Sequence, residues 1–220
     1  GASQLIAEGT AYQQVTFTSI SDNRYGAGGS FDTNGNVPDK FDAFGEPIGV
    51  LEVGDWGGIV LDAGSRASLD RAYLAFGGGI VPIEGGFDSF NVIEAHQGSL
   101  RLANSRVELN ASGLATGDRS GRGGNDAAAV FIRGAQPILV GNDFRFNLGA
   151  VVSIDVNSLT DVYQPDSGRT SGAIDRYEGY DDNFGPLVRD NRITTALPIG
   201  RPIIVNPIAG MVVRGGLLTI

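Results

Sequence analysis

Ile59-Val60-Leu61-Asp62 is a short apolar run that ends in a charged residue, and the pattern returns four times. The later copies are Ile93-Glu94-Ala95-His96, Val130-Phe131-Ile132-Arg133, Val152-Ser153-Ile154-Asp155 and Met211-Val212-Val213-Arg214. In each copy the first and third residues are apolar. Because side chains alternate between the two faces of a strand, these residues are predicted to face a core and the second and fourth to face water. A glycine or asparagine follows each copy, where a strand would turn a corner with positive φ: Gly64, Gly98, Gly134, Asn157 and Gly215.

A second set of short runs follows the first at a nearly constant distance. Its members are Leu74-Ala75-Phe76, Val107-Glu108-Leu109, Phe144-Arg145-Phe146 and Ile193-Thr194-Thr195. The step from Val130 to Phe144 equals the step from Ile93 to Val107, and Val152 begins the next turn shortly after Phe144. One turn of the repeat therefore takes about 22 residues, a length typical of solenoid coils. Phe76, Leu109, Phe144 and Phe146 are predicted to join the core.

Longer spacings between the runs are explained by loop insertions. Residues 22–55, 77–88, 112–127 and 196–202 all follow the second strand of a turn, whereas residues 160–186 leave from another corner. The pattern predicts an all-β fold, a right-handed parallel β-helix of about six rungs forming one domain over residues 1–220. An α-helical fold is disfavoured because the apolar spacing is two, and a β-sandwich predicts no such repeat.

The composition limits the partners that the chain could have. It contains 34 glycines and no cysteine, and its net charge is −9 with Lys40 as the only lysine. Nucleic acids and anionic lipids require clustered basic residues, so neither is expected as a partner. No apolar run approaches the roughly 20 residues that span a bilayer. The first residues show no charged-then-apolar stretch, so any signal peptide is expected to have been removed or not to be part of this piece. The chain is therefore expected to be a fragment or processed module of a larger protein.

Asn142 and Asn191 occupy matching places before the second strand of their turns. Asparagine tolerates the left-handed conformation, and stacked asparagines can form a hydrogen-bonded ladder. Ordinary turn chemistry is the alternative, and both interpretations make these residues structural.

One motif resembles a known family. The stretch Gly54-Asp55-Trp56-Gly57-Gly58-Ile59 resembles the entry to a rung in bacterial surface proteins with pectate-lyase-like β-helix repeats. Phe17-Thr18-Ser19 with Asp22-Asn23-Arg24-Tyr25-Gly26 is similar to the first rung of that family, and Asn142 to Asn157 and Gly185 to Arg214 are similar to later rungs. The resemblance implies an extracellular or cell-surface β-helix and says little about activity, since one fold hosts many functions.

In β-helix pectinases and lyases, which this chain resembles in fold, the site lies on the outward face of the first sheet. The matching outward positions here are Asp62, Glu94, His96, Arg133, Ser153, Asp155 and Arg214. Acid–base catalysis needs two carboxylates with separated pKa values, but these charges alternate in sign. Arg133 is expected to pair with Asp155 on the next rung in a solvated ladder. With one histidine and no cysteine, the chain is predicted not to be an enzyme.

One loop has the composition of a calcium site. Asp32, Asn34, Asn36 and Asp39 place oxygen-bearing side chains at alternate positions and then three residues on. Calcium takes six to eight oxygens from loops of this kind, so calcium is the one cofactor that the sequence indicates. A polar turn is the alternative, because Gly35 is in the fourth place of the loop and the glutamate expected at the twelfth is missing.

Two classes of function remain open. The first is a non-catalytic structural or adhesive module of a bacterial surface or secreted protein. The apolar ends near Leu5-Ile6 and Leu217-Leu218-Thr219-Ile220 are expected to contact neighbouring domains or to stack on further copies into fibres. The second is a polysaccharide-binding or polysaccharide-cleaving β-helix, in which Trp56, Tyr163, Tyr177 and Tyr180 could stack on extracellular glycans. A flat mixed-charge face favours the first class, and an aromatic groove with carboxylates favours the second.

Overall fold

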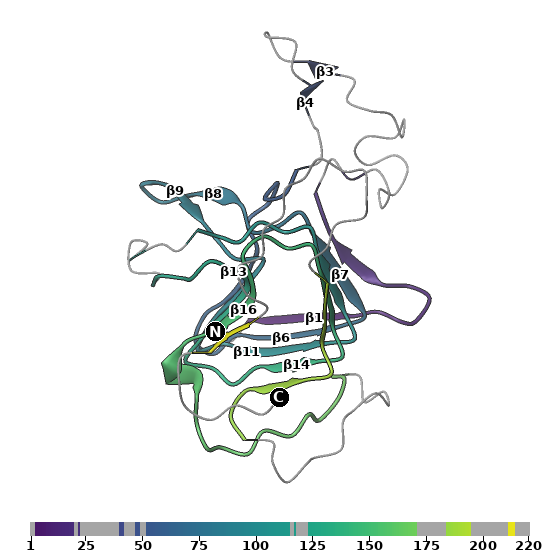
Figure 1. The fold of residues 1–220 in the computed structure, drawn as a ribbon, viewed down its shortest axis with the longest axis vertical. Helices are drawn as coiled ribbons and strands as arrows, with labels where there is room; N and C mark the ends of the chain where they lie inside the picture. Colours follow the sequence, from purple (N-terminus) through teal and green to yellow (C-terminus); the bar gives the residue numbers. More distant parts are fainter. Residues whose placement is uncertain are drawn as a thin grey trace.

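The computed structural model describes residues 3–19, 22, 40–41, 47–48, 52–114, 117, 123–170, 184–194 and 211–213. In these residues the protein is all-β, which confirms the predicted class: its one helix is the single 3-10 turn η1 (Val156–Ser158). Three five-stranded sheets, each entirely parallel, make up the body (Figure 1). Two antiparallel hairpins are added, β3 (Lys40–Phe41) with β4 (Pro47–Ile48), and β8 (Ile80–Ile83) with β9 (Gly86–Ser89).

We call the three parallel sheets I, II and III. Sheet I has the order β19 (Met211–Val213), β16 (Ala150–Ile154), β13 (Ala128–Arg133), β10 (Ile93–His96), β5 (Ile59–Leu61). Sheet II has the order β18 (Arg192–Thr194), β15 (Asp143–Arg145), β12 (Arg106–Glu108), β7 (Ala72–Ala75), β2 (Val15–Phe17). Sheet III has the order β1 (Gln4–Glu8), β6 (Arg66–Asp70), β11 (Ser99–Ala103), β14 (Ile138–Val140), β17 (Leu187–Arg189).

The chain visits the sheets in a fixed order, I, then III, then II, and then I again. Val130 of β13 pairs with Val152 of β16, so the shortest turn of the chain has the length that the sequence pattern predicts. The β8–β9 hairpin lies between β7 and β10, and the insertion at 160–186 lies between β16 and β17, both at the expected corners. Figure 1 shows β1, β6, β11 and β14 side by side, with the β8–β9 hairpin projecting away from them.

Sheet III is not expected from the sequence, because the pattern predicts only two strands in each turn. Its strands occupy the stretch between the first and second predicted runs of a turn. Ser99–Ala103 alternates as a strand should, but its outward Arg101 is only 7% exposed. The partners of this arginine are remote in sequence, so local patterning does not distinguish such a strand from a polar connection.

The predicted core of sheet I is confirmed where its side chains are described. The buried members are Leu61, Ile93, Ala95, Val130, Ile132, Val152 and Ile154. Ile59 is only partly buried, and the side chains of Met211 and Val213 lie outside the described residues.

The second set of runs forms sheet II, and the third residues of these runs do not join the main core as predicted. Phe144 is buried in the main core, but Phe76 and Leu109 belong to a separate cluster with Tyr73, and Phe146 is only partly buried. The reason is the backbone: φ is +61° at Phe76, +55° at Leu109 and +52° at Phe146. The chain turns at these residues, so their side chains leave the alternation of the strand and pack at the corner.

Positive φ also marks the corner that follows sheet I. Gly64 and Gly134 have φ values of +81° and +66°, as predicted. At the β10 corner the left-handed residue is Gln97 (+61°) and not Gly98. Gly98 is needed there for packing instead, because a Cβ would lie 2.7 Å from the Leu61 backbone oxygen. Asn157 belongs to η1, and Gly215 lies outside the described residues.

The predicted asparagine ladder is present. Asn142 donates through Nδ2 to Asn191 Oδ1 at 2.9 Å, and its Oδ1 accepts from the Ser105 backbone N–H at 3.0 Å. A second ladder that the sequence does not reveal joins Asn110 to Asn147 at 2.8 Å. Asn110, Asn142 and Asn147 are at most 3% exposed, so each ladder satisfies backbone groups that no water reaches.

Replacing Asn142 with alanine is expected to destabilise the protein by about 1–3 kcal/mol for each buried group that loses its partner. The Ser105 N–H and the Leu102 carbonyl are the two groups concerned. Urea unfolding measures the change. Asn157→Ala is the matched control, because Asn157 is exposed although it accepts from the Gly134 N–H. Equal losses in the two variants would contradict a structural role for the buried ladder.

Candidate functional site

The outer face of sheet I is more buried than the sequence predicts. Glu94 and Ser153 are predicted to face water, but they are 0% and 1% exposed. The segment 123–127 crosses this face: Ser153 Oγ donates to Asp126 Oδ2 at 3.2 Å, and Asn125 Nδ2 donates to Asn91 Oδ1 at 2.8 Å. The expectation of a solvated ladder is therefore wrong for these two positions. The loop inserted before β13 contacts Ser153, and Glu94 is buried in contact with His96.

The expected ion pair between Arg133 and Asp155 is also wrong. Both residues are described, and no salt bridge joins them. Asp155 instead caps η1, where its Oδ1 accepts from the Asn157 backbone N–H at 3.2 Å. Arg133 stands beside His96 in the register of β10 and β13. Asp62 is exposed as predicted, whereas Arg214 lies outside the described residues.

Glu94 and His96 form the one close acid–imidazole contact in the described part of the chain. His96 Nε2 lies 2.5 Å from Glu94 Oε1, and the Asn91 backbone N–H points at Glu94 Oε2 from 3.4 Å. The imidazole packs against the ring of Phe131, with 5.6 Å between the centroids. The His96 side chain is 13% exposed, so the imidazole reaches the surface, whereas the carboxylate of Glu94 is fully buried.

Two hollows adjoin on this face, and Asp62 lines both of them. The first, called the apolar groove, has a volume of about 510 Å³ and runs between β5, β10 and the β8–β9 hairpin. Its lining residues are Trp56, Gly57, Gly58, Val60, Asp62, Val81, Pro82, Ile83, Phe90 and Glu94. The second, called the polar cup, measures about 420 Å³. Its lining residues are Asp62, Ala63, His96, Gln97, Gly123, Arg133 and Asn157.

Comparison with known proteins yields no relative. No family model, no curated protein and no solved structure matches this chain. What the site can do therefore follows from its own geometry.

Trp56 is held in place by a hydrogen bond and by close packing against the backbone. Its Nε1 donates to the Ala75 carbonyl at 2.8 Å, and its six-membered ring packs so closely on Gly77 that a Cβ there would lie 2.9 Å away. The indole is thus a fixed wall of the apolar groove. Tyr163 does not contribute to either hollow, because it packs edge-on against Phe184 with 5.9 Å between the centroids. Tyr177 and Tyr180 lie outside the described residues.

The predicted calcium loop cannot be placed. Asp32, Asn34, Asn36 and Asp39 all lie outside the described residues, so the site stays a prediction. Within the described residues, no group of three or more histidine, aspartate or glutamate side chains is arranged to hold a metal ion. The same part of the chain contains no helix long and apolar enough to cross a membrane.

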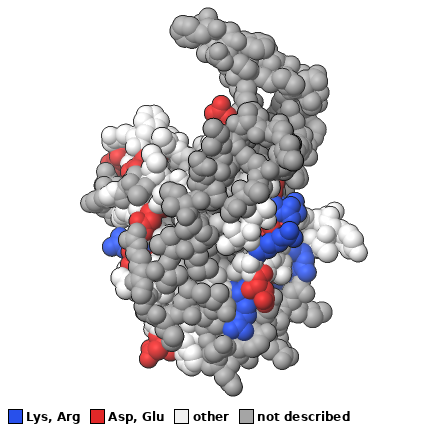
Figure 2. Space-filling view, in the orientation of Figure 1, with Lys and Arg blue, Asp and Glu red and all other residues white. Residues whose placement is uncertain are grey.

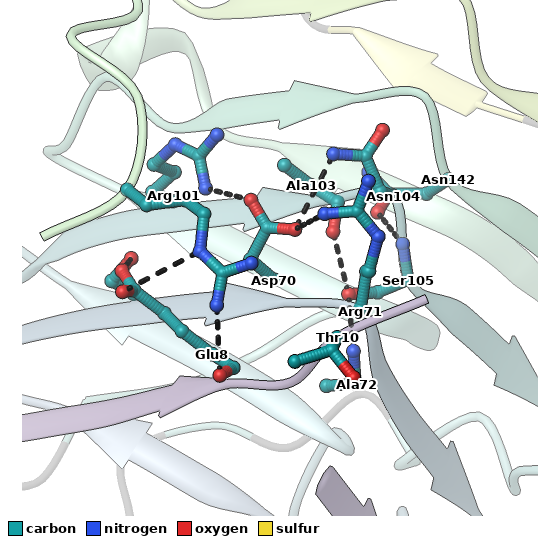
Figure 3. A network of polar contacts seen from close by, with 12 residues as sticks. Glu8, Thr10, Asp70, Arg71, Ala72, Arg101, Ala103, Asn104, Ser105 and Asn142 are labelled. Atoms are coloured by element: carbon teal, nitrogen blue, oxygen red, sulfur yellow. Dashed lines mark hydrogen bonds and ion pairs between the residues drawn. The ribbon is translucent and has the colours of Figure 1, made fainter. Parts of the chain in front are cut away.

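A buried ion-pair network, which the sequence pattern does not predict, lies on the outer face of sheet III (Figure 3). Arg101 donates to both oxygens of Asp166, at 2.8 and 3.2 Å, and its Nη1 donates to Asp70 Oδ2 at 2.7 Å. Desolvation lowers the pKa of Arg101, but the hydrogen bonds to Asp166 and Asp70 outweigh it and the pKa is raised. Close by, Thr170 N donates to Glu8 Oε1 at 2.7 Å. These contacts fasten residues 166–170, called the strap, across strands β1, β6 and β11.

Sheet II presents the mixed-charge face that the sequence predicts for sheet I. Arg106, Asp143 and Arg192 stand opposite one another in three successive strands, and Arg145 contacts the same Asp143. The hydrogen bond to Asp143 is the main reason that the pKa of Arg145 is raised. In Figure 2 basic and acidic side chains alternate over the side of the molecule where β7 lies in Figure 1.

Proposed function

We propose that this chain is a non-catalytic structural or adhesive module of a bacterial extracellular or cell-surface protein, built as a right-handed parallel β-helix. The observation that carries the proposal is the path of the chain: it returns to the same three sheets in the same order, and each return adds one parallel strand. A right-handed coil is the hand that parallel crossover connections adopt almost without exception. The similarity of Trp56-Gly57-Gly58-Ile59 to a rung entry in pectate-lyase-like surface proteins supports the same proposal.

Several contacts in the described residues suit a stiff rod. The two asparagine ladders bond successive turns to one another within the interior. The strap bonds three strands of sheet III from the outside. A module of this kind resists local opening because the turns joined by these contacts cannot separate without exposing buried polar groups, and it holds its inserted loops in fixed positions for display.

The partners proposed for such a rod are neighbouring domains or further copies of itself. Strands β1, β2 and β5 end the three sheets on one side, and β17, β18 and β19 end them on the other. Edge strands are the places where a sheet can be extended by another chain. Contacts made head to tail between copies need not close, and they would build a fibre. Leu218 and Ile220, in the apolar run predicted to make this contact, lie outside the described residues.

The purified chain is expected to show concentration-dependent assembly in sedimentation velocity and short rods in electron micrographs. Ile6 lies on the edge strand β1 and is 48% exposed, so Ile6→Asp places a charge on the edge without removing a core side chain. This variant should remain folded and lose assembly. Phe87→Asp on the β8–β9 hairpin, which is 75% exposed, is the control and should assemble normally. A wild-type chain that stays monomeric at millimolar concentration argues against fibres and leaves flanking domains as the proposed partners.

Polysaccharide binding or cleavage is the second candidate function. The observation in its favour is the pair of hollows on sheet I, where an indole, two carboxylates, an imidazole and a guanidinium line adjoining spaces. Incubation with neutral polysaccharides and with polygalacturonate separates the candidates. Release of reducing ends or of unsaturated products would establish the second candidate and overturn the non-catalytic proposal.

A further inference from the structure

The apolar groove combines a hydrophobic wall with charged side chains of one kind only. Val60, Val81, Ile83 and Phe90 provide the wall together with Trp56, and Val60 is 40% exposed. A volume of about 510 Å³ falls in the range of small-molecule sites, which are mostly apolar with a few polar groups that fix orientation. The two charged side chains in the lining, Asp62 and Glu94, are both carboxylates.

Because ionised carboxylates only accept hydrogen bonds, a complementary ligand must donate them. Glu94 is already bonded to His96, so Asp62 supplies the charge that a ligand would meet. Asp62 is exposed, its main-chain oxygen accepts from the Ser65 hydroxyl at 2.6 Å, and no ion pair within the described residues involves its carboxylate. An anionic ligand such as a uronate would be repelled at this position.

We infer that the apolar groove binds an organic ammonium ion with a hydrophobic body. The ammonium group donates to the exposed Asp62 carboxylate, while the hydrophobic body lies between Val60 and the β8–β9 hairpin and against the indole of Trp56. The indole adds to such binding because it offers a large apolar surface to the hydrophobic body. The net charge of −9 favours the approach of a cation from solution.

The chain contains a single tryptophan, so its fluorescence reports on this groove alone. Phenethylammonium is the probe, with 2-phenylethanol as its neutral counterpart and 3-phenylpropionate as its anionic one. The cation is expected to change Trp56 emission saturably. It should bind at least about tenfold more tightly than the neutral compound, because one charge-assisted hydrogen bond contributes a free energy of that size. Equilibrium dialysis provides a second measurement that does not depend on the indole.

Asp62→Asn is expected to remove the preference for the cation and to leave the weak binding of 2-phenylethanol unchanged. Glu84→Gln is the matched control, because Glu84 is exposed at the turn of the β8–β9 hairpin and does not line the groove. Both side chains are exposed, so neither variant threatens the fold. Three results would each overturn the inference: equal affinity for the three probes, unchanged cation binding in Asp62→Asn, or the same loss in Glu84→Gln. Binding of a neutral oligosaccharide without any response to phenethylammonium would also overturn it, in favour of a glycan site.

Discussion

Replacing Arg101 with methionine is expected to lower the free energy of unfolding by about 3–5 kcal/mol, the usual cost of removing one partner from a buried ion pair. Asp70 and Asp166 are 0% and 3% exposed, and the guanidinium of Arg101 donates to both. Methionine fills a similar space but leaves two carboxylates in a site that water does not reach. Urea unfolding followed by circular dichroism measures the loss.

The control for this variant is an arginine in a partly exposed ion pair. Arg106 Nε lies 4.0 Å from Asp143 Oδ2, and the two side chains are 41% and 24% exposed. Arg106→Met should therefore cost no more than about 1 kcal/mol, as exposed ion pairs do. If Arg101→Met and Arg106→Met lower the free energy of unfolding equally, burial of the strap network does not determine how much it stabilises the protein. A loss below about 1 kcal/mol in Arg101→Met would mean that the carboxylates regain water when the strap lifts.

The strands of sheet I could be predicted because everything that specifies them is local. Val130 and Ile132 alternate with outward residues over four positions, and Gly134 follows where positive φ is needed. The spacing to Val152 then follows from the requirement that successive turns pair in register. Local alternation, glycine position and spacing agree with one another, and such agreement is what makes a sequence pattern reliable.

Sheet III could not be predicted because its stabilising contacts join residues far apart in the chain. Arg101 looks like an outward, solvated residue in the run Ser99-Leu100-Arg101-Leu102-Ala103. Its partner Asp166 comes 65 residues later, inside an insertion that has no periodic pattern. No local property of an aspartate in a polar loop indicates that it will become buried against a strand.

For the candidate site on sheet I, the sequence predicts the position but not the shape. The outward residues Asp62, Glu94 and His96 follow from the alternation, and the structure brings Glu94 and His96 into contact. The hollows themselves depend on the β8–β9 hairpin and on residues 123–127, which fold over the sheet from insertions. The geometry of such loops follows from contacts with the body of the fold, which their own sequence does not contain.

Replacing Phe144 with alanine is expected to cost about 3–5 kcal/mol, the range for removing a fully buried aromatic side chain. Phe144 is 1% exposed in the main core and stands between Val107 and Ile193 in the register of sheet II. The cavity would lie where strands from successive turns meet, and a parallel sheet that pairs on both edges cannot close around it without breaking its register. The loss should therefore fall at the upper end of the range.

Two further variants make the Phe144 experiment decisive. Phe144→Leu keeps most of the volume and should cost under about 1.5 kcal/mol if packing is the cause. Phe87→Ala removes the same ring from a side chain that is 75% exposed and should leave stability nearly unchanged. If Phe144→Ala and Phe144→Leu cost the same, shape and not volume limits this site. If Phe144→Ala costs no more than Phe87→Ala, the side chain does not lie in a packed core, and the register of sheet II must be revised.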